Sequence, residues 1–469
     1  MALVSSFFTL FLTPMSNPAN NAEAATTTSG AEGAVGTPNI KDPNLKVELF
    51  AQGLSFPASM AFVDNSHILV LQKNDGTVHL ISNGILQQQP VLTVPVNNKN
   101  ERGLLGIVIL KNNFFSSSGG NAVTSINANN TNLSNEKKSS TTSMADRTTI
   151  LATPAKMLVF LYFTEAAGDK IIGNRVYRYE WDGQALVNPT LILDLPSKPG
   201  TNHQGGKMVI GPDRYLYAIT GEMQRNGQLQ NIKAGPMPDN TGVIFRVNPS
   251  DGSAAPGNPF TTSNNSTIID SNGNNSNNLS KYYAYGIRNS FGITFDPISK
   301  RLWDTENGEK TYDEINVVKP GFNSGWKQIM GPMTRNNSFT KDKLVNFPGS
   351  HYSDPVFSWL KSIGITDIEF LNSSKLGNQY TDNIFVGDIT SGNLYYFKVN
   401  GSRTGLEFGT SNNQTGLSDL VADNKNEVSE VTFGTGFDGI TDIETGPNDG
   451  YLYVLSYGSG SIYRIMPMQ

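Results

Sequence analysis

The stretch DIETGPNDGYLYVLSYGSGSIYRI, residues 442–465, shows the pattern that decides the fold. It begins with a short alternating strand, passes a Gly-Pro-Asn-Asp-Gly turn, and continues through the apolar run LYVLS. After a second glycine-rich turn it ends in the aromatic-basic-apolar strand IYRI. Period-2 patterning interrupted by Gly, Pro, Asn and Asp is typical of short antiparallel strands joined by tight turns. The stretch therefore predicts one small antiparallel sheet.

The same unit recurs along the chain. Close copies are KMVIGPDRYLYAITGE at residues 207–222 and GITFDPISKRLWDTENGE at residues 292–309, and looser copies begin near Ser59, Leu104 and Asp367. Six small sheets arranged radially form a propeller, which protects strand edges without closing a barrel. We therefore expect an all-β fold: a six-bladed β-propeller of four-stranded antiparallel sheets, in a single domain at residues 45–469. The N-terminal strand KVELFAQ, residues 46–52, should complete the last blade and close the ring.

Composition narrows the choice of function. The chain has 469 residues with 46 Gly, 24 Pro, no Cys and a net charge of −5. Without cysteine it can form neither disulfides nor a thiolate metal site. No basic cluster with interleaved aromatic residues is present, which argues against nucleic acid as a partner.

Three kinds of segment fall outside the repeats. Residues 1–25 contain a short apolar run followed by Ala22-Glu23-Ala24, a leader that resembles a signal peptide and is too short to span a membrane. Residues 26–44 are predicted to be a disordered linker. Asn- and Ser-rich insertions near 112–147 and 261–280 cannot bury enough apolar surface to fold, and should be surface loops. We expect an exported protein, extracellular or at the cell surface, and ten N-x-S/T sequons weakly agree.

Polar residues in the loops that lead into the inner strands are the candidates for chemistry, because these loops meet at the mouth of the central channel. His203 lies in GTNHQGGKMVIGPD, directly before the third unit. Its neighbouring glycines would let the backbone approach a ligand closely, and a neutral imidazole there could act as a general base. A structural role in capping a tight turn is the alternative.

Two further segments supply polar groups to the same end of the ring. Arg288 and Asn289, in YAYGIRNSFGITFD, offer a planar cation and an amide, or else form a plain surface pair. The turn Asn307-Gly308-Glu309 and the carboxylates of Asp313 and Glu314 supply the hard oxygen ligands that calcium prefers, although their spacing is not that of an EF-hand. A solvated acidic turn is the alternative.

Four motifs together resemble one family, the soluble pyrroloquinoline-quinone-dependent glucose, aldose and sorbosone dehydrogenases. They are ERGLLG at 101–106, NHQGGKMVIGPD at 202–213, YGIRN at 285–289 and DEINVVKPGFNSGW at 313–326. The resemblance implies that His203 takes the proton from the C1 hydroxyl of a sugar while a hydride passes to the quinone (PQQ). It implies that Arg288 and Asn289, with residue 101, contact the cofactor. It also implies that the carbonyls of Gly308 and Glu309 hold calcium, that Glu314 belongs to a second calcium site, and that an external electron acceptor completes the cycle.

The chain departs from this family pattern at the mouth. The family has a glutamine where this chain has Glu101, a lysine where it has Thr390, and two arginines where it has Gly439 and Thr441. These differences keep two other hypotheses open. One is a calcium-dependent, lactonase-type hydrolase, in which Glu101, Asp388, Asp442 and Asn289 hold a metal and His203 activates water. The other is a non-catalytic extracellular binding propeller.

Overall fold

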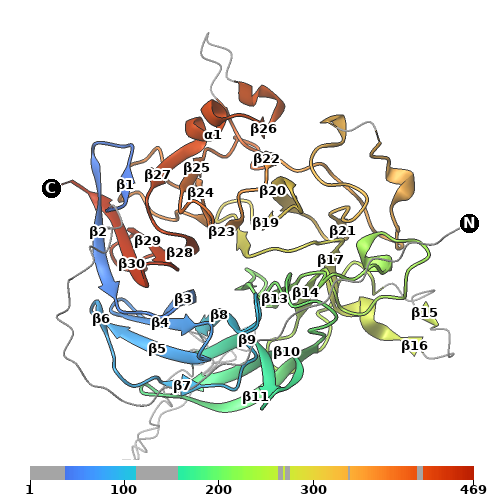
Figure 1. Cartoon of the computed structure of the whole chain (residues 1–469), viewed down its shortest axis with the longest axis horizontal. Coiled ribbons are helices and arrows are strands. Elements are labelled where there is room, and N and C mark those ends of the chain that lie inside the picture. The colour runs from blue at the N-terminus through green and yellow to red at the C-terminus, as the bar shows by residue number, and fades with distance from the viewer. Residues whose placement is uncertain are drawn as a thin grey trace, which may run out of the picture. The chain divides into compact units, whose positions relative to one another are not determined.

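Six antiparallel sheets stand around a common axis in the computed structural model of the chain (Figure 1). The structure describes residues 37–111, 157–261, 268–269, 275–335, 338–408 and 416–468. The innermost strands of the sheets are neighbours in the cyclic order β3, β8, β12, β18, β23, β28 and back to β3. This arrangement confirms the predicted six-bladed β-propeller.

The first three blades follow chain order. Blade one holds β3 (Pro57–Phe62), β4 (His67–Gln72), β5 (Thr77–Ser82), β6 (Ile85–Leu86) and β7 (Leu92–Thr93). Blade two holds β8 (Leu104–Lys111), β9 (Met157–Ala167), β10 (Lys170–Trp181) and β11 (Leu186–Leu195). Blade three holds β12 (Met208–Ile210), β13 (Leu216–Thr220), β14 (Val243–Val247), β17 (Tyr282–Tyr285) and β21 (Phe322–Asn323).

The last three blades continue the series. Blade four holds β18 (Gly292–Phe295), β19 (Leu302–Glu306), β20 (Thr311–Val318), β22 (Phe357–Lys361) and β26 (Val421–Ala422). Blade five holds β23 (Ile365–Phe370), β24 (Ile384–Asp388), β25 (Leu394–Phe397), β27 (Thr432–Thr435) and β1 (Asn39–Ile40). Blade six holds β28 (Ile440–Thr445), β29 (Leu452–Ser456), β30 (Ser461–Pro467) and β2 (Leu45–Gln52).

The blades are not all the plain four-stranded sheets that the repeats predict. Blades one, three, four and five each carry a short extra strand. In blades three and four that strand, β21 or β26, pairs in parallel with its neighbour. These additions lie at the outer edges, and the short helix α1 (Lys425–Val431), capped by the side chain of Asn424, precedes β27.

Burial explains why the second strand of each unit is so apolar. In β13, β19, β24 and β29 every residue is buried. Each blade packs both of its faces against neighbouring blades, so these strands meet protein on both sides, and their side chains do not alternate between core and solvent. The apolar runs LYAIT and LYVLS follow from this packing, while LWDTE and IFVGD also bury the carboxylates of Asp304, Glu306 and Asp388.

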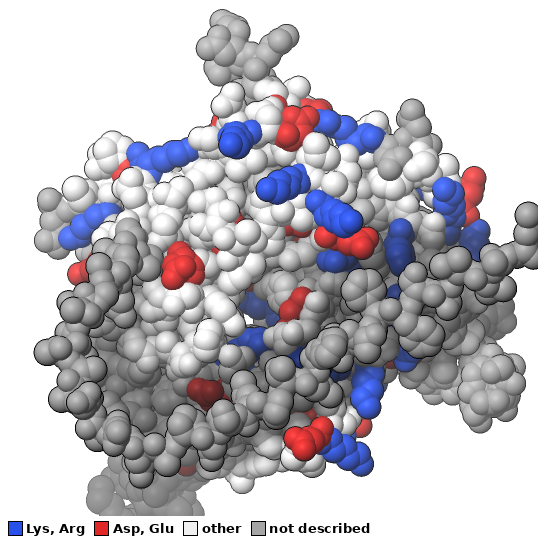
Figure 2. All heavy atoms as spheres, in the orientation of Figure 1, with Lys and Arg blue, Asp and Glu red and all other residues white. Residues whose placement is uncertain are grey.

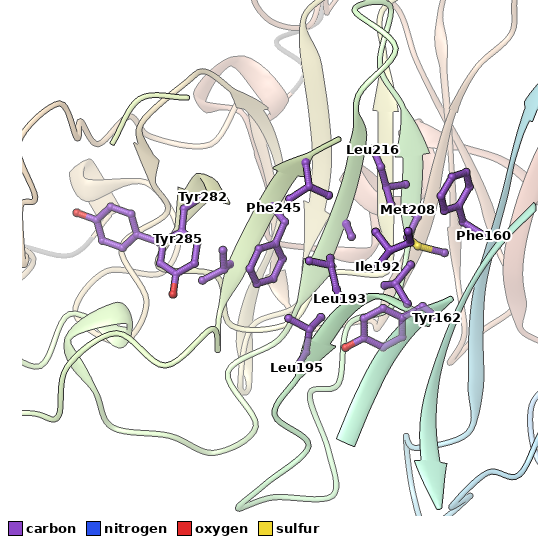
Figure 3. Close-up of a cluster of buried hydrophobic side chains, with 14 of the residues drawn as sticks. Phe160, Tyr162, Ile192, Leu193, Leu195, Met208, Leu216, Phe245, Tyr282 and Tyr285 are labelled. Atoms are coloured by element: carbon purple, nitrogen blue, oxygen red, sulfur yellow. The ribbon is translucent and has the colours of Figure 1, made fainter. Parts of the chain in front are cut away.

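The contact between blades two and three is built from large side chains (Figure 3). Phe160 and Tyr162 of β9 lie beside Met208 of β12, while Phe245 of β14 and Tyr282 of β17 continue the cluster outward. Buried aromatic rings of this size contribute both contact area and favourable edge-to-face geometry. The cluster therefore fixes how blade three, which carries His203 at its start, is placed against blade two.

The ring is closed by the N-terminal strand, as expected. β2 pairs antiparallel with β30, with Leu45 opposite Pro467 and Gln52 opposite Ser461. β1 goes one blade further and pairs with β27 of blade five. Residues 39 and 40, inside the predicted linker, are thus part of a sheet.

The other predicted segments are described only in part. The predicted leader and the insertion near 112–147 lie outside the described residues, and export remains a prediction. Within the insertion near 261–280, β15 (Ile268–Ile269) and β16 (Asn275–Ser276) form a small hairpin. Among the described residues, no helix is long and apolar enough to cross a membrane.

Closure by β2 leads to a first prediction. A chain that lacks residues 1–52 should lose the cooperative melting transition of the full chain, because β30 would be left as an unpaired edge and the ring would be open. Differential scanning calorimetry measures this. A chain that begins at Thr37, and so keeps β1 and β2, is the matched control. Equal melting temperatures for both truncations would show that β2 does not close the ring.

Candidate active site

The candidate site lies at the end of the ring where the innermost strands begin. Glu101, His203 and Arg288 with Asn289 belong to the loops that lead into β8, β12 and β18, so three blades bring them to the same end. A pocket of about 340 Å³ opens there, a size that accepts a small ligand. Figure 2 shows both acidic and basic side chains around the hollow in the middle of the ring. The pocket is lined by Ala58, Lys73, Asn100, Glu101, Leu105, Gly205, Lys207, Phe291, Asn307, Thr366, Ile389, Thr441 and Tyr457.

His203 is held through both of its ring nitrogens. Nδ1 is hydrogen bonded to Glu222, and Nε2 lies 3.0 Å from Nη2 of Arg288. A guanidinium can only donate, so Nε2 must be the acceptor and Nδ1 must carry the proton that it donates to Glu222. These partners assign the tautomer. They leave the basic lone pair of the imidazole on the nitrogen that faces Arg288.

Glu101 and Asn289 lock the histidine loop in place. The backbone N–H of His203 donates to Oε2 of Glu101 at 2.6 Å, and Nδ2 of Asn289 donates to the same oxygen at 3.0 Å. Oδ1 of Asn289 in turn accepts from the N–H of Gly205 at 3.2 Å. The structure thus brings together Glu101, His203, Arg288 and Asn289.

Arg288 is buried and only partly satisfied. Nη1 donates to the carbonyl of Asn307 at 2.9 Å, and the guanidinium lies 5.2 Å from the centre of the Trp326 ring. Its Nε is buried and has no hydrogen-bond partner among the described residues. Burial lowers the pKa of Arg288, although Glu222 and Glu306 act in the opposite direction. A buried donor left unpaired is costly, and it suits a site that receives a polar ligand.

The motif glycines are explained by a close approach between two loops. A Cβ on Gly106 would come within 2.0 Å of the carbonyl oxygen of Gly206, so the ERGLLG and NHQGG motifs can pack together only with glycine there. Gln204, fully buried, fastens the same loop to blade two: its backbone carbonyl accepts from the Tyr162 hydroxyl, and its Oε1 accepts from Asn174 at 2.8 Å. The position of His203 therefore depends on blade two as well as blade three.

The residues predicted for calcium are divided between two places. Gly308 and Glu309 follow β19 at the mouth, and no described residue donates a hydrogen bond to the carbonyl of either one. Asp313 ties this turn to blade five, since it accepts from the N–H groups of Gly308 and Gly364 at 2.9 and 2.7 Å. Glu314 is buried further along β20, where it accepts from the N–H of Gly331.

The carboxylates of the hydrolase hypothesis are not gathered around one point. Asp388 caps its own loop, accepting from Gly392 N–H and the Tyr395 hydroxyl at 3.0 and 2.8 Å. Asp442 is paired with Lys207 at 2.6 Å, and Glu101 holds the histidine loop. In the part of the chain that the structure describes, no three His, Asp or Glu side chains form a group that could bind a metal ion. The expected metal site of Glu101, Asp388 and Asp442 is therefore absent from these residues.

Lys207 bridges blades across the channel below the mouth. Its Nζ lies 2.8 Å from Asp367 of β23 and 2.6 Å from Asp442 of β28. Burial alone would lower the pKa of Lys207, but these two carboxylates outweigh it and raise that pKa. Glu369 lies near this group. Its pKa is raised by burial to about 7, against the hydrogen bonds from Thr445 and the charge of Lys207.

Three of these residues were not identified from the sequence. Glu222 ends the third repeat, 19 residues after His203, and only the fold brings it to Nδ1. Lys207 and Lys73 are single lysines in β-sheet units, where a solvent-facing lysine is the ordinary expectation. The glycine-rich loop before Lys207 was the one available signal, because it already marked that end of the unit as unusual.

Comparison with known proteins assigns the chain to a family. The sequence profile described as glucose/sorbosone dehydrogenase matches residues 152–464. The chain belongs to the glucose/sorbosone dehydrogenase family. Among curated relatives, the aldose sugar dehydrogenase YliI of Escherichia coli is 26% identical over 316 residues, which is 66% of this chain and 73% of that protein.

Solved structures show the same fold as this member of the glucose/sorbosone dehydrogenase family. The PQQ-bound aldose sugar dehydrogenase of Streptomyces coelicolor matches with a TM-score of 0.57 at 22% identity, over 92% of this chain and 99% of that one. The soluble aldose sugar dehydrogenase of Escherichia coli in its apo form matches with a TM-score of 0.60 at 23% identity, over 90% of this chain and 100% of that one. At these identities the likeness establishes the fold alone.

The buried carboxyl of Glu369 leads to a second prediction. Its pKa is about 7 in the folded chain, against an ordinary value of 4.5, so the folded state holds a proton that the unfolded state releases. The contribution of the protonated Glu369 carboxyl to the free energy of unfolding is full below about pH 4.5, and it is lost as the pH rises through about 7. In Glu369→Gln the melting temperature should therefore fall less than in the wild type between about pH 5 and about pH 8.

The exposed Glu407, paired with Lys398 on the surface, provides the control. Glu407→Gln should keep the wild-type pH dependence of melting. If Glu369→Gln also keeps it, the proton is not held at Glu369.

Proposed function

We propose that this chain oxidises the C1 hydroxyl of an aldose, with PQQ as cofactor and His203 as the general base. The observation that supports it most directly is the assigned tautomer of His203. Nδ1 carries the ring proton and donates it to Glu222 in a hydrogen bond. The lone pair needed to accept a hydroxyl proton is therefore on Nε2, at the mouth of the ring. An oriented imidazole of this kind suits proton removal near neutral pH.

The mouth pocket fits a flat, anionic cofactor. Leu105, Phe291, Ile389 and Tyr457 give it apolar and aromatic walls, and Asn100 and Asn307 add polar edges. The unpaired Nε of Arg288 is a donor that a carboxylate or quinone oxygen could use. The negative charge of Glu101 is partly compensated, because its Oε2 accepts from His203 N–H and from Asn289.

Arg288 has to leave Nε2 of His203 before a sugar hydroxyl can donate to that nitrogen. In the described arrangement the guanidinium covers the lone pair at 3.0 Å. An anionic ligand in the pocket would attract the guanidinium and so free the base. Binding of the cofactor and activation of His203 are thereby linked through one side chain.

Calcium would be held by the carbonyls of Gly308 and Glu309, which no described residue uses. Backbone carbonyls are ordinary ligands of calcium. When bound, PQQ and its metal supply a polarised two-electron acceptor. The chain supplies the rest: His203 takes the hydroxyl proton on Nε2, Glu222 stabilises the resulting imidazolium, and the walls of the pocket hold the sugar so that the hydride of C1 can leave.

The proposed function is tested first on the wild-type chain. Addition of PQQ and calcium to the apo-protein should change the quinone absorbance with a stoichiometry of one, and dye-coupled oxidation of aldoses should follow. Failure to bind the quinone would refute the proposal.

Replacing the base gives a third prediction. His203→Ala should lower kcat by roughly 10²–10⁴-fold, the usual contribution of a general base, while the Kd for PQQ stays within about threefold. His79→Ala, which removes a histidine on β5 of blade one, is the control and should leave kcat unchanged. A His203→Ala variant with wild-type turnover would assign the proton transfer to another group.

Glu222 is a positioning residue, and its variant gives a fourth prediction. Glu222→Gln keeps a hydrogen-bonding group beside Nδ1 but removes the charge that stabilises the protonated imidazole. We expect turnover to fall by about tenfold and the acid limb of the kcat profile to move to lower pH, because His203 would hold a proton less strongly. Glu222→Asp should restore the position of the limb. An unmoved limb in Glu222→Gln would leave Glu222 with a purely structural role.

A further inference from the structure

Lys73 differs from the other charged groups that line the mouth pocket. It follows β4 in blade one and is partly buried. Its Nζ donates to the carbonyl of Asn100 at 2.7 Å and to Oδ1 of Asn74 at 3.1 Å, and both of these partners are neutral. No carboxylate of the described residues forms an ion pair with it, whereas Lys207 in the same pocket has two.

A partly buried ammonium without a paired carboxylate favours the binding of an anion. Removing the ammonium from water costs free energy that neutral hydrogen-bond acceptors recover only in part. Glu101 attracts the Lys73 ammonium but forms no ion pair with it, and its Oε2 accepts from His203 N–H and Asn289. A bound carboxylate would supply the missing counter-charge.

The chain holds Lys73 at the mouth through a neighbouring loop. The N–H of Leu104 donates to the carbonyl of Lys73 at 2.9 Å. Gly103, at a φ of 142°, leaves room for the lysine side chain, since a Cβ there would come within 2.8 Å of Cγ of Lys73. Gly103 of the ERGLLG motif thus makes room for the Lys73 side chain and also permits the turn.

A second cation lies behind the opposite side of the pocket. Lys73 belongs to blade one and Asn307 to blade four, which lies across a six-membered ring from it. Behind Asn307 stands Arg288, whose Nη1 donates to the Asn307 carbonyl and whose Nε is unpaired. Leu105, Phe291 and Tyr457 give the same pocket its apolar lining.

We propose that Lys73 binds a carboxylate of the ligand in the mouth pocket, and that the pocket is therefore selective for a flat, apolar acid with carboxylates on its edge. This inference rests on the proposed function, in which that ligand is PQQ. It names a cation of this chain that takes part in binding, whereas Thr390, Gly439 and Thr441 stand at positions where the family resemblance implies cations.

The experiment is an equilibrium titration of apo-protein with PQQ, followed by quinone absorbance and by quenching of tryptophan fluorescence. Lys73→Met should raise the Kd by about 10- to 100-fold at low salt, which is the usual effect of losing one charge-assisted hydrogen bond. Lys73→Arg should recover most of the affinity. Lys99→Met, an exposed lysine of the adjoining loop, is the matched control and should bind as the wild type does.

A second probe separates this inference from the proposed function. Benzene-1,3,5-tricarboxylate is a flat aromatic acid without a quinone. If wild type binds it, and Lys73→Met binds it at least about tenfold more weakly, the anion site stands even where PQQ itself fails to bind. If wild type binds PQQ and Lys73→Met binds it within twofold, Lys73 is not the site. If wild type binds neither acid, both proposals are overturned. Thermal melts of each variant confirm that the fold is retained.

Discussion

The pairing of β2 with β30 is the contact on which the rest of the structure depends. A propeller has no covalent closure, and here the strand that completes blade six comes from the other end of the chain. Several polar contacts of the candidate site cross from one blade to another. Asn289 reaches Glu101 over 188 residues of sequence, and Arg288 reaches His203 over 85. These side-chain contacts depend on the relative positions of the blades in the ring. The site therefore exists only while the ring is closed.

The electrostatics of the mouth follow from where each carboxylate points and not from how many there are. Glu101 accepts two N–H donors, Asp388 caps its own loop, and Asp442 accepts from Lys207, the Ser59 hydroxyl and the Met60 N–H. Each of these groups is engaged with the wall of the channel. The Lys73 ammonium, by contrast, lines the mouth pocket and has only neutral hydrogen-bond partners among the described residues. The mouth is consequently better suited to an acid than its count of acidic residues suggests.

The sequence predicted the architecture well because the residue pattern of each repeat is sufficient to specify short antiparallel strands and tight turns. The pattern of an apolar second strand, a Pro-Asp-Gly-type turn and a closing strand recurs in six close or looser copies, which predicts six blades. KVELFAQ is a strand outside these repeats, and it was therefore assigned to close the ring. His203, Arg288 and Asn289 were selected as candidates because they stand at matching ends of their units. Glu222 and Lys73 were not, because a single carboxylate or lysine beside a turn has no distinguishing local pattern. Asp388 and Asp442 were misplaced as metal ligands, since their hydrogen-bond partners lie in turns and blades that spacing alone cannot bring together.

Lys207 and its two carboxylates lie where the mouth pocket meets a second pocket at the far end of the channel, and Lys207 lines both. This buried ion-paired lysine stands between the two pockets, and the mouth is the expected opening of the site. In the proposed reaction the sugar enters, and its oxidised product leaves, by the same opening through which an electron acceptor must later approach. The sugar and the electron acceptor therefore use the mouth one after the other. In the proposed reaction, the rate of product release limits turnover together with the proton transfer to His203.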